Sequence, residues 1–193
     1  MSVQPVTPPH RLLTVAEYLE IGEVEPGYTE LVEGRLLMSP SPTFRHSRGN
    51  GKLWAALEAQ LPAHLVSAMD IDVDLQLGPA DEPGTVRRPD VVVVRDSAPV
   101  RIDREGGVLH ASEVVLAIEI LSPGSRRMDL VLKRSEYADA GIPHYWIVDL
   151  EEPVSLLACH LAGEFGYVDG GAATGVFRTA EPFRVEIDLD ALT

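Results

Sequence analysis

The sequence predicts a mixed α/β fold, an α+β arrangement in which helices pack against a central mixed β-sheet. Two segments, 91–94 and 114–121, are almost continuously apolar, as strands covered on both faces are. A third, 122–143, carries helix-start and helix-stop residues and is followed by another apolar strand. We therefore expect one domain spanning residues 1–193, with residues 1–10 flexible.

The first third of the chain predicts a helix, a hairpin and a second helix. Thr14 and Glu17 form a capping box before "AEYLEI", so a short helix is expected to end near Gly22. "YTELVEGRLLMSP" predicts two strands around a Glu-Gly turn. Residues 44–61 predict a helix with His46 near its start. Its apolar stripe comprises Leu53, Trp54, Leu57 and Leu61.

The middle of the chain predicts three strands. "MDIDVDLQLG" alternates apolar and acidic residues, which predicts a half-buried strand with a solvated acidic face. Its aspartates lack the Gly and terminal Glu of a calcium loop, so we expect no metal there. "RRPDVVVVRD" and "EVVLAIEIL" predict central strands of the sheet.

The last third predicts a helix followed by strands. "SPGSRRMDLVLKRSEYADAGIP" has Ser and Pro to start a helix, Gly141 to end it and Pro143 just beyond. "HYWIVDL" predicts a further strand. "DGGAATG" and "PFRVEIDL" predict antiparallel strands at the edge of the sheet.

Composition limits the partners and the location. The net charge of -14 argues against broad, sequence-independent DNA binding, so any nucleic-acid site must be local. The single cysteine, Cys159, permits no internal disulfide, which fits the cytoplasm. An apolar run of about 18 residues, long enough to span a bilayer, does not occur, so no membrane association is expected.

Glu119 lies in the most apolar part of its strand, between Ile118 and Ile120. An ionised carboxylate is costly there unless it is paired. If the strands of Asp90 and Glu119 are neighbours, both carboxylates can face one pocket and bind a hard cation such as Mg²⁺. The alternatives are an ion pair between Glu119 and a buried arginine, and a turn or strand-start role for Asp90.

Lys133 is the candidate cation on the following helix. It lies three residues after Leu130 and four before Tyr137, which both belong to the inward face. The spacing predicts that Lys133 points toward the sheet. The alternative is a lysine at the helix edge whose ammonium reaches solvent.

The chain resembles a known family. "RRPDVVVV", followed by "VLAIEILSPGSRRMDLVLKRSEYADAGIPHYWIVD", resembles the Uma-two family of restriction endonucleases (domain of unknown function 820), a branch of the PD-(D/E)xK nuclease superfamily. "LLTVAEYLEI", "YTELVEGRLLMSPSPTFRH" and the closing strand follow the same order, so the resemblance covers most of the chain. It implies a restriction-endonuclease-like core with a central mixed sheet flanked by helices.

The resemblance also implies a site. Asp90 and Glu119 would bind Mg²⁺, for which Mn²⁺ can substitute, with the main-chain carbonyl of Ile120 as a further ligand. Glu30 matches an acidic residue that such nucleases supply from an earlier element. The superfamily pattern places Lys two residues after the Glu, where this chain has Leu121. Lys133 stands where the family's lysine has moved to the helix.

Four further residues are candidates for contacting the substrate. His46 matches a family histidine at the start of a helix, although a hydrogen-bonded structural role is the alternative. Ser125, Arg126 and Arg127 precede the helix of Lys133 and could hold a phosphate at its start.

We therefore predict a Mg²⁺-dependent endonuclease that hydrolyses phosphodiester bonds in DNA, acting as a homodimer. The alternatives are a nuclease-fold module that binds a nucleic-acid or protein partner without cutting, and a phosphoesterase acting on a small nucleotide in a closed pocket.

Overall fold

The computed structural model describes residues 11–22, 28–39, 41–122 and 124–193. The segment 1–10, expected to be flexible, and Pro123, expected to help start a helix, lie outside the described residues. Three β-sheets and the helices that cover them make up this part of the chain.

The largest sheet has six strands in the order β11-β10-β9-β8-β6-β3. β8 and β9 run parallel, and the other neighbours are antiparallel, so the sheet is mixed as predicted. β8 lies between β6 and β9, which gives Glu119 a strand on either side. The strands are β3 Leu65–Met69, β6 Val91–Arg95, β8 Val114–Ile120, β9 His144–Asp149, β10 Ser155–Leu161 and β11 Tyr167–Thr174.

The other two sheets are smaller. The five-stranded sheet has the order β2-β1-β5-β4-β7, and β12 and β13 pair only with each other. The C-terminal strands were expected at the edge of the main sheet; β11 is at that edge, whereas β12 and β13 form a separate ribbon. The strands are β1 Tyr28–Val32, β2 Arg35–Ser39, β4 Val73–Asp74, β5 Val86–Arg87, β7 Leu109–His110, β12 Val176–Thr179 and β13 Val185–Asp188.

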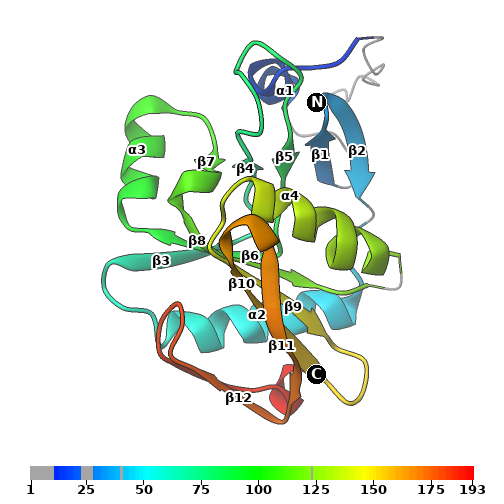
Figure 1. Ribbon diagram of the computed structural model, residues 1–193, viewed down its shortest axis with the longest axis vertical. Coiled ribbons are helices and arrows are strands. Elements are labelled where there is room, and N and C mark those ends of the chain that lie inside the picture. Colours follow the sequence, from blue (N-terminus) through cyan, green and yellow to red (C-terminus); the bar gives the residue numbers. More distant parts are fainter. Residues whose placement is uncertain (1–10, 23–27, 40, 123) are drawn as a thin grey trace.

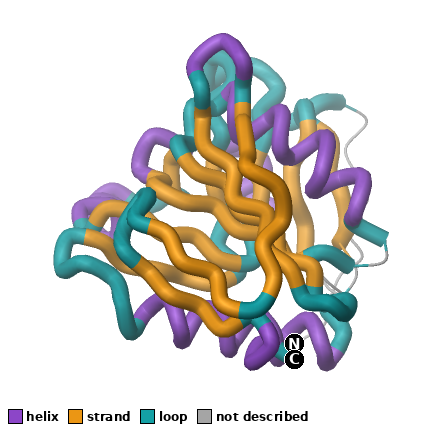
Figure 2. The backbone as a smooth tube through the Cα atoms, turned by 60° about the horizontal axis from the view of Figure 1, so that its bottom comes forward, coloured by secondary structure: helices purple, strands orange, loops and turns teal. Residues whose placement is uncertain are grey.

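The helices lie on both sides of the main sheet (Figure 1). In this view α2 (cyan) lies below β3, and α4 (yellow-green) lies above β9; Figure 2 shows the strands between helices. They are α1 Val15–Ile21, α2 Phe44–Glu58, α3 Ser97–Glu105, a π-helical turn Met128–Lys133 that runs directly into α4 Arg134–Asp139, and short 3-10 turns at Ala111–Glu113, Gly163–Phe165 and Asp190–Leu192.

Strand β8 separates two hydrophobic cores because its residues alternate between the faces of the sheet. Leu116 and Ile118 join the core that includes Leu53 of α2. Ala117 joins the opposite core, which includes Tyr137 of α4. The alternation puts Glu119 on the side of Ala117, facing the helix that carries Lys133.

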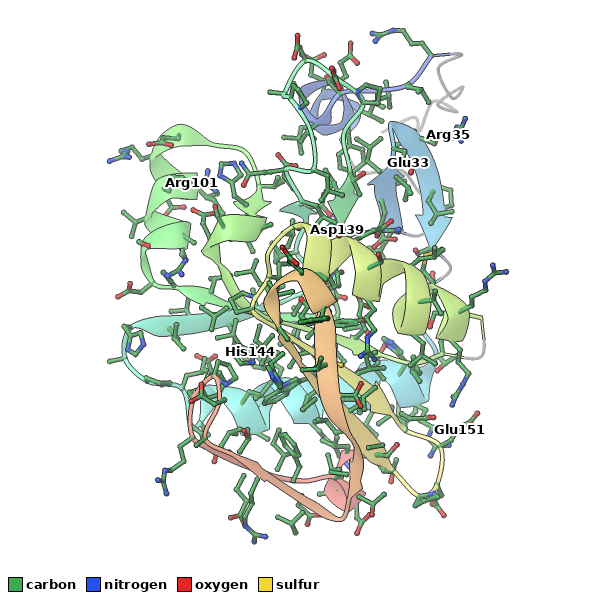
Figure 3. All side chains as sticks on the ribbon, in the orientation of Figure 1. Glu33, Arg35, Arg101, Asp139, His144 and Glu151 are labelled. Carbon is green, nitrogen blue, oxygen red and sulfur yellow. The ribbon has the colours of Figure 1, made fainter. Side chains whose placement is uncertain are left out.

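Several local predictions are confirmed. Thr14 and Glu17 form the capping box of α1, which ends at Gly22 with φ of 68°. The hairpin turn uses Glu33 and Gly34, with φ of 47° and 75°. Figure 3 places Glu33 and Arg35 at this turn, away from the main sheet. These signals are local, so they needed no knowledge of the tertiary structure.

The prediction of one continuous strand over "MDIDVDLQLG" is wrong. β3 ends at Met69 and only Val73–Asp74 pair as β4, because Asp70 and Gln76 adopt φ of 54° and 52° and interrupt the extended backbone. Ile71 and Leu77 are consequently exposed, whereas Val73 and Leu75 are buried. The acidic residue Asp72 is not on a solvated face either: its Oδ1 lies 2.7 Å from Arg88 Nε.

In the part of the chain that the structure describes, no helix is long and apolar enough to cross a membrane.

Candidate active site

Lys133 lies where three acidic residues from different elements meet. Its Nζ atom is 2.8 Å from Glu119 Oε1 on β8 and 3.2 Å from Glu30 Oε1 on β1. The third carboxylate, Asp129, comes from the same helix one turn earlier and lies 3.9 Å away. Lys133 is only 7% exposed, so its predicted inward orientation is confirmed. The partner of Glu119 is this ammonium and not a buried arginine.

Tyr137 completes the contacts of Glu119. Its hydroxyl donates a hydrogen bond of 2.9 Å to Glu119 Oε1, the same oxygen that Lys133 contacts. Asp129, Lys133 and Tyr137 are spaced four residues apart, and the helix directs all three toward β8. The π-helical turn lies within this stretch; such turns occur frequently at functional sites.

The acidic groups around Lys133 differ in how easily they ionise. Burial raises the pKa of Glu119 well above its usual value, and Lys133 offsets only part of that rise. Burial also raises the pKa of Asp129. Glu30 behaves oppositely, because Lys133 and Arg87 lower its pKa despite its burial. Burial would lower the pKa of Lys133, but the three carboxylates raise it, so Lys133 is an ammonium.

Arg87 holds Glu30 in place through a buried ion pair. It is fully buried, with NH1 3.0 Å from Glu30 Oε2 and with Nε and NH2 each 2.7 Å from a carboxylate oxygen of Glu136 on α4. The other Glu30 oxygen, Oε1, accepts the main-chain N–H of Arg88 at 3.0 Å. These contacts fix the position of Glu30. Because Arg87 is fully buried, it is not positioned to contact a substrate.

Asp90 precedes β6 and lies beside the end of β8. Its Oδ2 atom accepts the main-chain N–H of Ile120 at 2.6 Å. Its main-chain carbonyl accepts hydrogen bonds from Asn50 Nδ2 at 3.2 Å and from the Asp70 N–H at 3.3 Å. Asp70 also lies close enough for its pKa to rise, by burial and by repulsion from Asp90. The predicted pairing of Asp90 with the strand of Glu119 is therefore present.

His46, in the first turn of α2, reaches the same place. Its Nε2 atom lies 3.1 Å from the Ile120 carbonyl oxygen and 3.3 Å from Asp90 Oδ2. The hydrogen bond to Asp90 raises the pKa of His46, and burial opposes the rise. The imidazole thus contacts two of the three groups expected to bind a cation.

The donor types at this end of β8 fit a hard divalent cation. Carboxylate and carbonyl oxygens are the ligands that such a cation prefers, whereas an imidazole suits transition metals better. Among the described residues, no three His, Cys, Asp or Glu side chains already enclose a metal-sized space.

The loop before the helix contributes less to the site than its composition suggests. Ser125 Oγ accepts the Ser122 N–H at 3.0 Å and so stabilises the turn. Arg126 is bound to Asp149, with NH2 2.7 Å from Oδ2. Arg127 is exposed. Arg134, the residue after Lys133, also pairs with an acidic side chain: its NH2 lies 2.7 Å from Asp169 Oδ2.

Sequence reasoning missed two residues of the cluster. Asp129 was not singled out, and Tyr137 was used only to mark the apolar face of the helix. Their spacing of four residues on either side of Lys133 was the available signal, since such residues share a helix face. Arg87 was not among the predicted site residues either, because its burial between two carboxylates depends on tertiary packing.

The comparisons with known proteins agree with this architecture. A search of curated proteins finds no match. The structure is similar to the crystal structure of "a putative nuclease belonging to DUF820" from Anabaena variabilis ATCC 29413, with a TM-score of 0.71, 18% identity, and coverage of 93% of this chain and 97% of that one. The model of the family Uma2, described as "Putative restriction endonuclease", matches residues 15–167. The match spans most of the sequence, and the chain therefore belongs to the Uma2 family.

Proposed function

We propose that this protein is a Mg²⁺-dependent endonuclease that hydrolyses phosphodiester bonds in DNA. The observation that carries the proposal is the surplus of acidic groups at the end of β8. Glu30, Glu119 and Asp129 surround one ammonium, and Asp90 lies beside Ile120. Burial disfavours the charged form of Glu119. Lys133 offsets only part of this effect, and a divalent cation would offset more of it.

Asp90, Glu119 and the Ile120 carbonyl would hold the cation, with His46 next to two of them. When bound, Mg²⁺ would polarise a phosphodiester oxygen and lower the pKa of a bound water. Lys133, being protonated, can donate hydrogen bonds but cannot remove a proton. It would orient the attacking water and stabilise the additional negative charge on the phosphate. Glu30 would keep the ammonium in place, fixed in turn by Arg87.

The substrate contacts are proposed at the edge of this cluster. His46 and Ser125 would lie near the scissile phosphate, and Arg127 would contact a neighbouring phosphate from its exposed position. Arg126 would have to leave Asp149 to do the same. A homodimer, which would allow both strands of DNA to be cut, and a cytoplasmic location remain predictions.

A non-catalytic module that binds a partner is the second candidate. The observation in its favour is that Arg87, Arg126 and Arg134 are bound to carboxylates, which reduces the positive charge available to a nucleic acid. The net charge of -14 also disfavours binding of a nucleic acid.

The first test is a calorimetric titration of Mn²⁺ into the wild type and Glu119→Gln. This variant keeps the shape of the side chain and removes its charge. We expect saturable binding to the wild type and at least about a tenfold weaker affinity in the variant. Absence of binding to the wild type, also when a DNA oligonucleotide is present, would favour the non-catalytic module.

The second test is cleavage of supercoiled and linear DNA, with RNA compared in parallel, in Mg²⁺, in Mn²⁺ and in EDTA. We expect metal-dependent cleavage by the wild type and its loss in Lys133→Met. Circular dichroism would show whether the variant is folded. Metal binding without cleavage of any of these substrates would contradict the proposed activity.

A further inference from the structure

We propose that Tyr137 is a positioning residue for the metal-binding carboxylate: its hydroxyl holds Glu119 by Oε1 and leaves Oε2 for the cation. The hydroxyl is 2.9 Å from Oε1, and the contact is buried. Lys133 contacts the same oxygen, so neither contact uses Oε2. This inference rests on the proposed metal site and names a residue that determines how well that site binds.

The position of Tyr137 is fixed independently of Glu119. Its side chain is fully buried, and its ring packs edge-on against Tyr145 with centroids 5.1 Å apart. The Tyr145 hydroxyl in turn donates to the Asp129 carbonyl at 3.0 Å. Because the ring cannot move without disturbing this packing, its hydroxyl is a preorganised donor.

Lys133 divides its contacts among several partners. Its ammonium contacts both Glu119 and Glu30 and would also orient the attacking water. The phenol has no such second task, because it is enclosed by the core. Tyr137 would therefore keep Glu119 oriented while Lys133 orients the attacking water and stabilises the negative charge on the phosphate.

The contact fixes the orientation of the Glu119 side chain. Because Tyr137 is buried and packed against Tyr145, its hydroxyl restricts the positions that the Glu119 carboxylate can adopt. Residues that orient a metal ligand in this way typically change metal affinity about 10- to 100-fold when they are replaced. We expect a loss of this size in Tyr137→Phe, which removes the hydroxyl and keeps the ring.

The experiment compares Tyr137→Phe with Tyr167→Phe by calorimetric titration of Mn²⁺. Tyr167 is a matched control: its buried hydroxyl donates at 2.7 Å to the carbonyl of Ile142, and it does not contact Glu119. Both variants lose one buried hydrogen bond, and urea unfolding would show how far each is destabilised. Only Tyr137→Phe should lose Mn²⁺ affinity.

Cleavage of DNA gives an independent readout. In Tyr137→Phe the Mg²⁺ concentration for half-maximal rate should rise about 10- to 100-fold, while the rate at saturating Mg²⁺ should stay within a few-fold of the wild type. Unchanged Mn²⁺ affinity in Tyr137→Phe would overturn the positioning role, and equal losses of affinity in the two variants would also overturn it. Either result would leave the proposed function intact. Failure of the wild type to bind Mn²⁺ would overturn both.

Discussion

The Asp90 carboxylate is bound to the main chain of the neighbouring strand: its Oδ2 atom accepts the Ile120 N–H at 2.6 Å. The Ile120 carbonyl, expected to bind the cation, belongs to the same residue. Asp90 and β8 therefore cannot shift independently, and the distance between the expected ligands is set by the pairing of β6 with β8.

Asp90→Asn should remove metal binding without unfolding the protein. The asparagine carbonyl can still accept the Ile120 N–H, and loss of the charge relieves repulsion with Asp70. We expect the free energy of unfolding without metal to change by no more than about 1 kcal/mol. Mn²⁺ at 100 times its Kd should stabilise the wild type by about 2.7 kcal/mol and the variant hardly at all. Thermal melts with and without Mn²⁺ measure both; equal metal-induced shifts would contradict the assignment.

Arg87→Lys should be strongly destabilising although it conserves the charge. A lysine cannot bridge Glu30 and the two oxygens of Glu136 with the fixed fork of a guanidinium. Breaking a buried pair costs about 3–5 kcal/mol, and a retained charge recovers part of it, so we expect a loss of about 3 kcal/mol in urea unfolding.

The matched control is Arg178→Lys. Arg178 also forms a forked pair, with Glu186, but the two side chains are 64% and 58% exposed. A loss below about 1 kcal/mol is expected there. Similar losses at both positions would mean that burial does not determine the strength of these pairs.

Two glycines of α2 should respond to alanine in opposite directions. A Cβ at Gly49 would lie 2.6 Å from Leu150 Cδ1, and Leu150 is only 5% exposed. At Gly51 nothing lies within 4 Å. Alanine favours a helix over glycine by about 1 kcal/mol, whereas overpacking costs about 1–3 kcal/mol. We expect Gly51→Ala to raise the midpoint of thermal unfolding and Gly49→Ala to lower it.

The pair of Arg101 and Glu113 predicts a pH dependence of stability. Arg101, labelled in Figure 3, forms a hydrogen bond that lowers the pKa of Glu113, and the His110 N–H lowers it further. The folded pKa lies below the unfolded one, so the stabilisation is present above about pH 4.5 and is lost as pH falls through the folded value.

The measurement is the difference in unfolding free energy between the wild type and Glu113→Gln. It should be about 1 kcal/mol at pH 7 and should shrink toward zero in more acidic buffer. A difference that stays constant from pH 7 to pH 3 would show that the charge of Glu113 is not the cause.

The parts of the fold that the sequence predicts best are those with local signals. The capping box of Thr14, the Glu-Gly turn and the apolar runs of β6 and β8 each follow from neighbouring residues. The prediction for the segment around Asp72 was wrong because the alternation of apolar and acidic residues does not reveal that Asp70 and Gln76 adopt positive φ. α3 and β7 were not predicted, since "SAPVRIDRE" contains few large apolar residues and β7 has only two residues.

The candidate site also contains residues that local sequence signals identify and residues that they do not. Glu119 could be singled out because one charge within an apolar strand is conspicuous, and Lys133 because its place in the helix period is fixed by Leu130 and Tyr137. The role of Arg87 could not be inferred, because it depends on Glu30 and Glu136, which are 57 and 49 residues away along the chain.

The order of the candidate site residues along the chain has a consequence for how the site could be exchanged between relatives. Glu119, Lys133 and Tyr137 all lie between the start of β8 and the end of α4, a continuous segment from Val114 to Asp139. A chimaera that exchanged this segment with a relative would carry the three residues together as a unit. Asp90, Glu30 and His46 would stay with the recipient. In such a chimaera, Lys133 and Glu119 would come from one parent, whereas Asp90 and Glu30 would come from the other.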